Sequence, residues 1–378
     1  MLKRVCLSVK PPEGSTPEER TVFLIERMPT PTNAVMRRKP FFAIGVLFLV
    51  LLLALLLAAS LGTVSIPAVD IASIALKRAF GISTGARWSD TQEVIVWQLR
   101  LPRVLGAALV GAALATAGVL FQGLLRNPIA DPYLLGTSGG AALAATIALL
   151  LPVSVGILGF TLVPVAAFVG ALASVMIVYQ IARVGARTPI TTLLLAGFAI
   201  SSMMASVMSF LMLMNQNTLQ RVVLWTMGGI SASGWDALRV VTPLILLGFV
   251  AAFAVTNDLN AFLLGEEQAA ALGVAVERQK FVVMTIGALL TGTAVAISGL
   301  VGFVGLIVPH IVRLVLGPDH RLLLPASFLS GGIFLVLADL LARMVLAPSE
   351  IPLGVVTAII GAPFFIYLLR QTKREYTF

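Results

Sequence analysis

Few residues of this chain have side chains suited to chemistry, and those few favour binding over catalysis. The sequence contains no GxxxxGKS or GxxxxGKT, no HExxH and no GxSxG pattern, and none of its lysines follows a glycine. It therefore has no P-loop for a nucleotide and no metalloprotease or hydrolase signature. His310 and His320 flank the end of an apolar segment, where a packed or interfacial role is a better interpretation than metal binding. We expect no catalytic residue, no metal site and no cofactor bound by this chain.

Charged residues inside or beside apolar segments are the first candidates for function. In LVLADLLARMVLA, Asp339 and Arg343 are four residues apart with the acid first, the favourable order for a pair on one helix face. An unpaired charge in lipid costs about 2.5–3.5 kcal/mol or more, so Asp339 is either half of a structural ion pair or a functional group. Arg100 and Arg103, in WQLRLPR, are expected at the same side of the membrane as Arg343. Three arginines there suit forked contacts with carboxylates of a partner, and the alternative is simple anchoring at the interface.

A second group of polar residues lies in LLGEEQAAALG, between two apolar segments. Glu266, Glu267 and Gln268 fall on a predicted short helix, which Gly265 and Gly273 bound. A compact helix of this kind offers polar contacts to the groove of a partner. The alternative is an ordinary amphipathic connecting loop.

The stretch RNPIADPYLLGTSGG, residues 126–140, interrupts the apolar pattern. Pro128 and Pro132 stop a helix there, and the glycines that follow allow a tight backbone. Irregular backbone near a membrane is tolerated only where protein or an aqueous cavity covers it, so we expect a loop beside a pathway. Ile190 and Thr191, directly after a proline, open a later apolar segment at the same level.

The elements that must position these residues follow from the composition. Of 378 residues, 58% are hydrophobic and 11% are charged, whereas about a quarter are charged in an ordinary soluble domain. The apolar residues come in blocks of about twenty, each long enough to cross a hydrocarbon layer of about 30 Å as a helix. The sequence therefore predicts an all-α, polytopic membrane protein. Ten spans are expected, at 41–61, 101–125, 134–151, 160–182, 190–214, 239–256, 278–298, 303–317, 323–345 and 353–370.

The basic residues indicate how these spans are oriented. The net charge is +9, but the arginines and lysines stand singly between apolar blocks, which favours the positive-inside pattern over binding of nucleic acid. Their distribution predicts that both termini and the segment 257–277 are cytoplasmic. Residues 1–40 are predicted to be a disordered cytoplasmic tail, with Met36 a candidate for the true start, and 371–378 a short cytoplasmic tail. Cys6 is the single cysteine, so no intrachain disulfide forms.

Several motifs in one consistent order give the chain a resemblance to a known family. They are RLPR, GAALATAGVLFQGLLRNPIADPYLLGTSGGA, LLLAG, WTMGGISASGW, LLGEEQAAALGV, GFVGLIVPHIVRLVLGPDHRLLLPASFLSGG, ADLLAR and EIPLGVVTAIIGAPFFIYLL. Between about residues 41 and 370 the chain resembles the FecCD-type permeases. These are membrane subunits of bacterial importers driven by ATP, and they serve iron–siderophore complexes, haem and cobalamin.

The resemblance implies an architecture and a set of partners. It implies the type II ABC importer permease fold, with ten transmembrane helices per subunit, in the bacterial cytoplasmic membrane. Two such subunits pair, as a homodimer or a heterodimer, around one pathway. Two ABC ATPase subunits bind on the cytoplasmic side and a substrate-binding protein docks outside, so this chain itself is expected not to be an enzyme.

The resemblance also implies roles for particular residues. It implies that the binding protein docks on Arg100, Arg103 and Arg343. It implies that the cytoplasmic gate is formed by Asn127, Ile129, Ile190 and Thr191. It implies that the helix that couples to the ATPase includes Gly265, Glu266, Glu267, Gln268, Leu272 and Gly273. The sequence departs from the more hydroxyl-rich gate associated with the cobalamin branch, so the ligand stays open.

A rival interpretation is an ion-coupled secondary transporter that works without an ATPase. A weak likeness between GAALVGAALATAGVLFQG and GALLTGTAVAISGLVG, five spans apart, is consistent with the inverted repeats of such transporters. Ion coupling requires ionisable residues in mid-membrane, and this sequence has few. The importer is therefore the leading hypothesis.

Overall fold

The computed structural model describes residues 40–62, 64–82, 88–151, 161–230 and 234–375. By its contacts the chain divides between Phe42 and Ala43, and the helical bundle belongs to the second unit, Ala43–Phe378. The predicted tail at 1–40 falls almost entirely outside the described residues, and so does Cys6. The described part of the chain is helical and contains no β-strand.

A helix occupies each of the ten predicted segments. They are α2 (Pro40–Ser60), α5 (Leu101–Leu124), α6 (Thr137–Leu150), α7 (Leu162–Ala182), α8 (Ile190–Met214), α10 (Trp235–Ala254), α13 (Val276–Ser298), α14 (Val304–Leu316), α15 (His320–Met344) and α16 (Leu353–Glu375). Among the described residues, seven helices are long and apolar enough to cross a membrane, and three apolar helices are shorter: Thr137–Leu150, Val304–Leu316 and Leu353–Tyr367. The all-α polytopic fold is confirmed, and the count of ten crossings stays a prediction.

Some helix boundaries differ from the predicted ones, because apolarity marks the part of a helix suited to the hydrocarbon layer and not its whole length. α10 begins at Trp235 and not at 239, and α15 begins at His320 and not at 323. Asp319 precedes α15, and its side chain accepts a hydrogen bond from the Arg321 backbone N–H, as an N-cap does. α16 continues to Glu375, beyond the predicted end at 370.

In the described parts of the chain, seven shorter helices lie between these segments, and of them only α12 is predicted by the sequence as a short helix. They are α3 (Ala68–Phe80), α4 (Asp90–Val94), η2 (Ile95–Arg100), η3 (Pro132–Leu135), α9 (Gln216–Thr226), α11 (Thr256–Phe262) and α12 (Glu266–Ala271). The helices α3 and α4 lie in segment 62–99, between the first two predicted spans. The carboxylate of Glu93 on α4 holds them together, because it accepts hydrogen bonds from Lys77, Arg78 and Trp88 at 2.6–3.0 Å.

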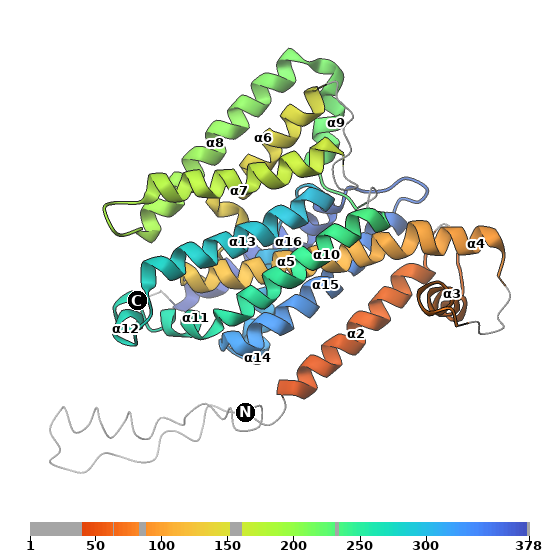
Figure 1. The fold of residues 1–378 in the computed structure, drawn as a ribbon, viewed down its shortest axis with the longest axis horizontal. Helices are drawn as coiled ribbons and strands as arrows, with labels where there is room; N and C mark the ends of the chain where they lie inside the picture. The colour runs from red at the N-terminus through yellow and green to blue at the C-terminus, as the bar shows by residue number, and fades with distance from the viewer. Residues whose placement is uncertain (1–39, 63, 83–87, 152–160, 231–233, 376–378) are drawn as a thin grey trace, which may run out of the picture. The chain divides into compact units, whose positions relative to one another are not determined.

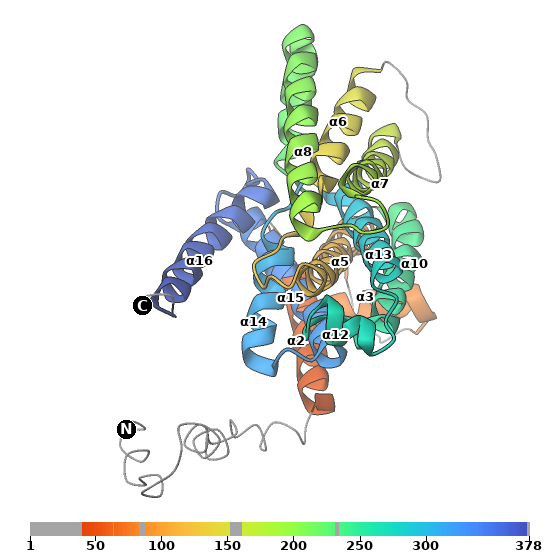
Figure 2. The same ribbon diagram turned by 90° about the vertical axis from the view of Figure 1, so that its left-hand side faces the viewer.

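The helix α5 lies in the middle of the bundle, and α10, α13, α14 and α15 pack around it (Figures 1 and 2). α6, α7 and α8 pack on one another beside this group. Small residues bring the helices close, among them Gly111 and Ala115 of α5, which face Gly331 of α15. A Cβ atom added at Gly111 of α5 would overlap the carbonyl oxygen of Gly331 on α15, so the two backbones are in contact. Because lipid tails are as apolar as the side chains, such close packing, and not hydrophobic burial, holds the helices together.

This contact predicts a large difference between two alanine substitutions. Gly111→Ala should destabilise the protein by about 1–3 kcal/mol, because the added methyl group meets backbone that cannot turn aside. Gly45→Ala on α2 is the matched control, since nothing lies within 4 Å of a Cβ atom there. It should be neutral or stabilising by up to about 1 kcal/mol. Thermal unfolding in detergent measures both, and equal midpoints would contradict the described packing of α5 on α15.

Candidate functional site

The buried carboxylate of Asp339 organises one end of the molecule, which we call the Arg103 end. Its Oδ1 accepts hydrogen bonds from Nε and Nη2 of Arg103 on α5, both at 3.0 Å. Its Oδ2 accepts one from Nε of Arg343 at 2.9 Å, which is the i,i+4 pair expected from the sequence. Asp339 is only 1% exposed, so two guanidinium groups compensate a charge that water does not reach.

Arg103 also binds a second carboxylate, that of Glu350, which the sequence analysis did not select. Nη1 and Nη2 of Arg103 donate to the two oxygens of Glu350 at 2.8 and 2.9 Å, in the forked geometry that only arginine offers. These hydrogen bonds hold the pKa of Glu350 below its ordinary value. Glu350 stands in the loop between α15 and α16 and its side chain is 46% exposed. Its contact with Arg103 depends on the fold, and no local sequence pattern predicts it.

Arg100 lies apart from this cluster and is buried. Its guanidinium donates to the carbonyl oxygens of Ala59 at 2.8 Å and Ser60 at 3.2 Å, and also to that of Val64. The last carbonyl groups of a helix lack partners within the helix, and Arg100 provides them at the end of α2. Arg343 likewise donates to the carbonyl oxygen of Ala58 at 3.0 Å. All three arginines therefore bind groups of their own chain, and their role in docking stays a prediction.

A pocket of about 490 Å³ opens beside this cluster, and its wall includes Arg103, Asp339 and Glu350. At its far side three connections of the chain cross, namely residues 225–229, 298–300 and 353–354, which we call the glycine junction. The backbone N–H of Gly229 donates to Ser298, that of Leu353 to Gly228 and that of Gly354 to Met227, at 2.8–3.0 Å. A Cβ atom at Gly299 would overlap the carbonyl oxygen of Trp225, so the backbones approach as closely as glycine allows.

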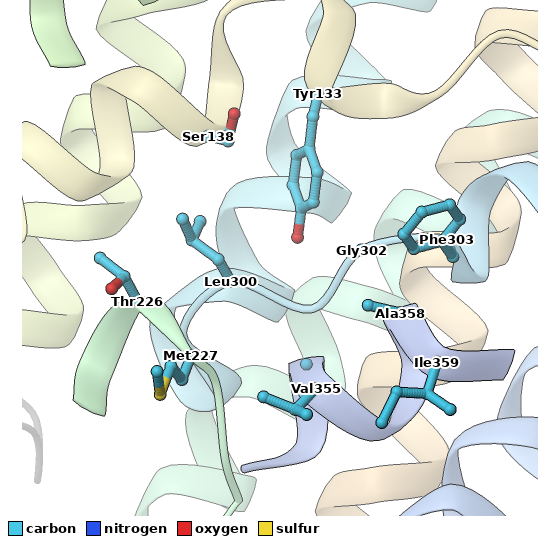
Figure 3. Close-up of a pocket in the computed structure, with 11 residues that line it drawn as sticks. Tyr133, Ser138, Thr226, Met227, Leu300, Gly302, Phe303, Val355, Ala358 and Ile359 are labelled. Carbon is cyan, nitrogen blue, oxygen red and sulfur yellow. The ribbon is translucent and has the colours of Figure 1, made fainter. Parts of the chain in front are cut away.

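A second pocket, of about 630 Å³, lies on the other side of the glycine junction. Met227, Leu300 and Gly354 line this pocket, whereas their chain neighbours Gly228, Gly299 and Leu353 line the first. Figure 3 shows the side chain of Tyr133 projecting toward the connection that follows α13, with residues of α16 opposite. The Tyr133 hydroxyl donates to the carbonyl oxygen of Val301 at 3.0 Å and accepts from its N–H at 3.2 Å. The junction thus lies between a pocket whose wall includes three charged side chains and a pocket whose lining residues include none.

The predicted gate residues occupy the ends of two helices. Asn127 and Ile129 stand in the turn after α5, where the Asn127 side chain accepts a hydrogen bond from the Ile129 N–H at 3.0 Å. Ile190 is the first residue of α8, and Thr191 beside it is exposed. The structure describes no hydrogen bond or ion pair that joins the two segments, so their joint role as a gate stays a prediction.

The short helix α12 has the form that the sequence indicated. Gly265 and Gly273 bound it with φ values of 114° and 89°, a backbone conformation that favours glycine. Its two glutamates differ, however. Glu267 is exposed, whereas Glu266 turns inward and its carboxylate binds Nζ of Lys280 at 2.7 Å. Leu272, directly after the helix, is 66% exposed, so α12 and its C-terminal end present one charged and one apolar side chain to solvent.

The histidine and acidic side chains do not gather as a metal site requires. His320 is fully buried and its Nδ1 lies 2.7 Å from Oδ1 of Asn260, which is a packed position as expected. Within the described ranges, no group of three or more histidine, cysteine or acidic side chains is placed to hold a metal ion. The expectation that this chain binds no cofactor remains untested.

Comparison with known proteins places this arrangement in a family. Residues 49–371 match the FecCD transport family. The cobalamin import system permease protein BtuC of Halobacterium salinarum is 45% identical over 75% of this chain and 75% of its own length. The hemin transport system permease protein HmuU of Yersinia pestis is 39% identical over 79% of this chain and 90% of its own length.

Two further relatives agree in sequence and in fold. The Fe(3+) dicitrate transport system permease protein FecD of Escherichia coli is 40% identical over 74% of this chain and 86% of its own length. A solved structure described as an inward-facing conformation of a metal-chelate type ABC transporter superposes with a TM-score of 0.74 at 29% identity. That match covers 87% of this chain and 98% of the other. The chain belongs to the FecCD transport family, and it is a multi-pass permease subunit of the ABC importer class.

Proposed function

We propose that this chain forms the pathway by which an importer driven by ATP carries an iron chelate, haem or cobalamin across the bacterial cytoplasmic membrane. The observation that carries the proposal is the pair of pockets on either side of the glycine junction. A ligand that enters at the Arg103 end meets charged walls first and apolar walls beyond the junction. The names of the relatives support this class of cargo, because they refer to cobalamin, hemin and ferric dicitrate.

The partners follow from the two ends of the molecule. On this proposal the Arg103 end faces outward and receives a substrate-binding protein, while α12 and both termini face the cytoplasm. Two ATPase subunits bind there, and a second copy of this chain completes the pathway. The exposed Glu267 on α12 and the exposed Leu272 directly after it support an interface of this kind, since interfaces combine polar and apolar contacts. ATP is hydrolysed in the separate subunits, and this chain is no enzyme.

The ion-coupled alternative finds little support. A carrier that exchanges protons or sodium needs an ionisable group in the span whose charge changes during the cycle. Asp339 is the buried acid of α15, and each of its two oxygens accepts a hydrogen bond from a guanidinium group, so it is the partner in structural ion pairs. Membership of the FecCD transport family also supports an importer that borrows its energy from an ATPase.

Reconstitution tests the proposal directly. Vesicles that contain only this chain should accumulate no ferric dicitrate, hemin or cyanocobalamin. Vesicles that also contain its ATPase and binding protein should accumulate one of them when ATP is present. Accumulation by the chain alone under an ion gradient would establish the ion-coupled transporter in its place.

The exposed face of α12 predicts a defined effect of charge reversal. Glu267→Lys reverses the charge that faces the ATPase and should lower the affinity of that subunit by about tenfold, since a rim charge opposite a partner is worth about 1–2 kcal/mol. Asp236→Lys is the matched control, because Asp236 is 73% exposed and lies on α10, away from α12. Binding of the purified ATPase to the permease in nanodiscs measures both. An equal loss in the two variants would argue against α12 as the contact.

The Arg103–Glu350 pair predicts a gain of affinity at the other end of the molecule. Glu350→Gln removes a charge that occupies the fork of Arg103, so a carboxylate of the docked binding protein should bind more tightly. We expect about a two- to fivefold lower Kd, the range for a partly exposed ion pair. Asp236→Asn, which releases Arg239 from an exposed pair, serves as control. Weaker docking of Glu350→Gln would mean that Glu350 itself contacts the partner.

A further inference from the structure

We infer that Lys280 is a positioning residue that transmits movement of α12 to the first turn of α8. The inference rests on the proposed function, in which α12 receives force from the ATPase and the start of α8 belongs to the gate. It adds the physical connection between the two, and it assigns a role to three residues, Lys280, Glu277 and Thr188, that no sequence motif selected.

Lys280 is buried, and its ammonium group binds three acceptors from three segments of the chain. Nζ lies 2.7 Å from Oε2 of Glu266 on α12 and 3.0 Å from Oε1 of Glu277 on its own helix, α13. It also donates to the carbonyl oxygen of Thr188, in the turn between α7 and α8, at 3.0 Å. An ammonium group has three N–H donors, so each donor has one partner and none is left over. If one of the three acceptors moves, the ammonium group moves with it, and the lengths of its other two hydrogen bonds change.

The backbone of Thr188 is held from both sides. Its carbonyl oxygen accepts from Lys280, and its N–H donates to Oε2 of Glu277 at 2.9 Å. The Glu277 carboxylate thus binds Lys280 with one oxygen and Thr188 with the other. Thr188 is 2% exposed, so water does not replace these bonds readily. One peptide segment is fixed to α13 by two charged side chains.

The residues directly after Thr188 connect its hydrogen-bonded backbone to the predicted gate residues. Pro189 comes next, with its φ restricted by the ring, and α8 begins at Ile190. There is consequently no flexible linker between the held residue and the first turn of the helix. A displacement of Thr188 reaches Ile190 and Thr191, the predicted gate residues, through one stiff residue.

The contact between Glu266 and Lys280 is the place where movement of α12 reaches the Lys280 cluster. Among the ion pairs of the described residues, Lys280–Glu266 alone joins α12 to another element. The Glu266 side chain is 33% exposed, so its carboxylate can leave Lys280 for water at modest cost. When it leaves, Lys280 keeps Glu277 and Thr188 as its only partners. Figure 1 shows α12, the start of α13 and the α7–α8 turn at the same end of the molecule.

The test monitors the gate directly and needs no knowledge of the cargo. A cysteine is introduced as Thr191→Cys in a Cys6→Ser background, and its rate of labelling by fluorescein maleimide is measured in nanodiscs with the bound ATPase, with and without ATP. In this parent protein ATP should change the rate. With Lys280→Met the ATP-dependent change should fall by about tenfold while ATP hydrolysis continues, and Lys280→Arg should restore most of it.

Two further variants separate transmission from general damage. Lys77→Met removes another lysine–glutamate bond, the 3.0 Å contact with Glu93, far along the sequence from the Lys280 cluster, and it should leave the change intact. Glu277→Gln keeps the shape of the side chain and should give an intermediate loss of the ATP-dependent change in labelling. This variant replaces Lys280→Met in the test if Lys280→Met does not assemble with the ATPase. An unaltered response in Lys280→Met, or in Glu277→Gln where the former does not assemble, overturns the inference.

The inference and the proposed function fail in different ways. A parent protein that imports cargo with ATP but shows no ATP-dependent labelling at position 191 overturns the inference alone. A parent protein that binds no ATPase and imports nothing overturns the proposed function, and the inference with it.

Discussion

Polar groups of the main chain find no water in a hydrocarbon layer, and this constraint explains most of the structure. Long helices satisfy it internally, which is why apolar segments of the chain are helical without exception in the described part. Several helices, however, stop short of a full span, and their ends must find partners elsewhere. At the glycine junction three connections supply one another with hydrogen bonds, through Gly229, Leu353 and Gly354. Side chains do the same for α2, whose last carbonyl oxygens bind Arg100 and Arg343.

The same constraint decides how far the sequence predicted the structure. Apolar blocks located all ten long segments, because hydrophobicity and helix formation coincide in lipid. The helices α3 and α9 were missed because each is amphipathic, so no continuous apolar run marks it. Local spacing predicted the Asp339–Arg343 pair correctly, since four residues on a helix are neighbours.

Contacts between distant segments lay beyond such reasoning. Arg100 looked like a residue for a partner, yet it binds the end of α2, which no spacing in the sequence reveals. Glu350, Glu277 and Lys280 were not selected, because each looks like an ordinary polar residue at a helix end. Their partners stand 247 and up to 92 residues away in the sequence, and only the packing of α5 and α13 brings them together.

The two ends of the molecule use different interactions. Near α12 the Lys280 cluster is made of charges with partly exposed acids, so a carboxylate that lets go is solvated and the contact exchanges easily. At the glycine junction the bonds join backbone to backbone, and they link residues of different exposure: Gly228, Ser298 and Leu353 are buried, whereas Met227 and Gly229 are exposed. α13 spans the distance between the two ends, from Lys280 near its start to Ser298 at its end, about 27 Å along the helix axis. α13 thus joins a set of exchangeable side-chain contacts at one end to a backbone crossing at the other.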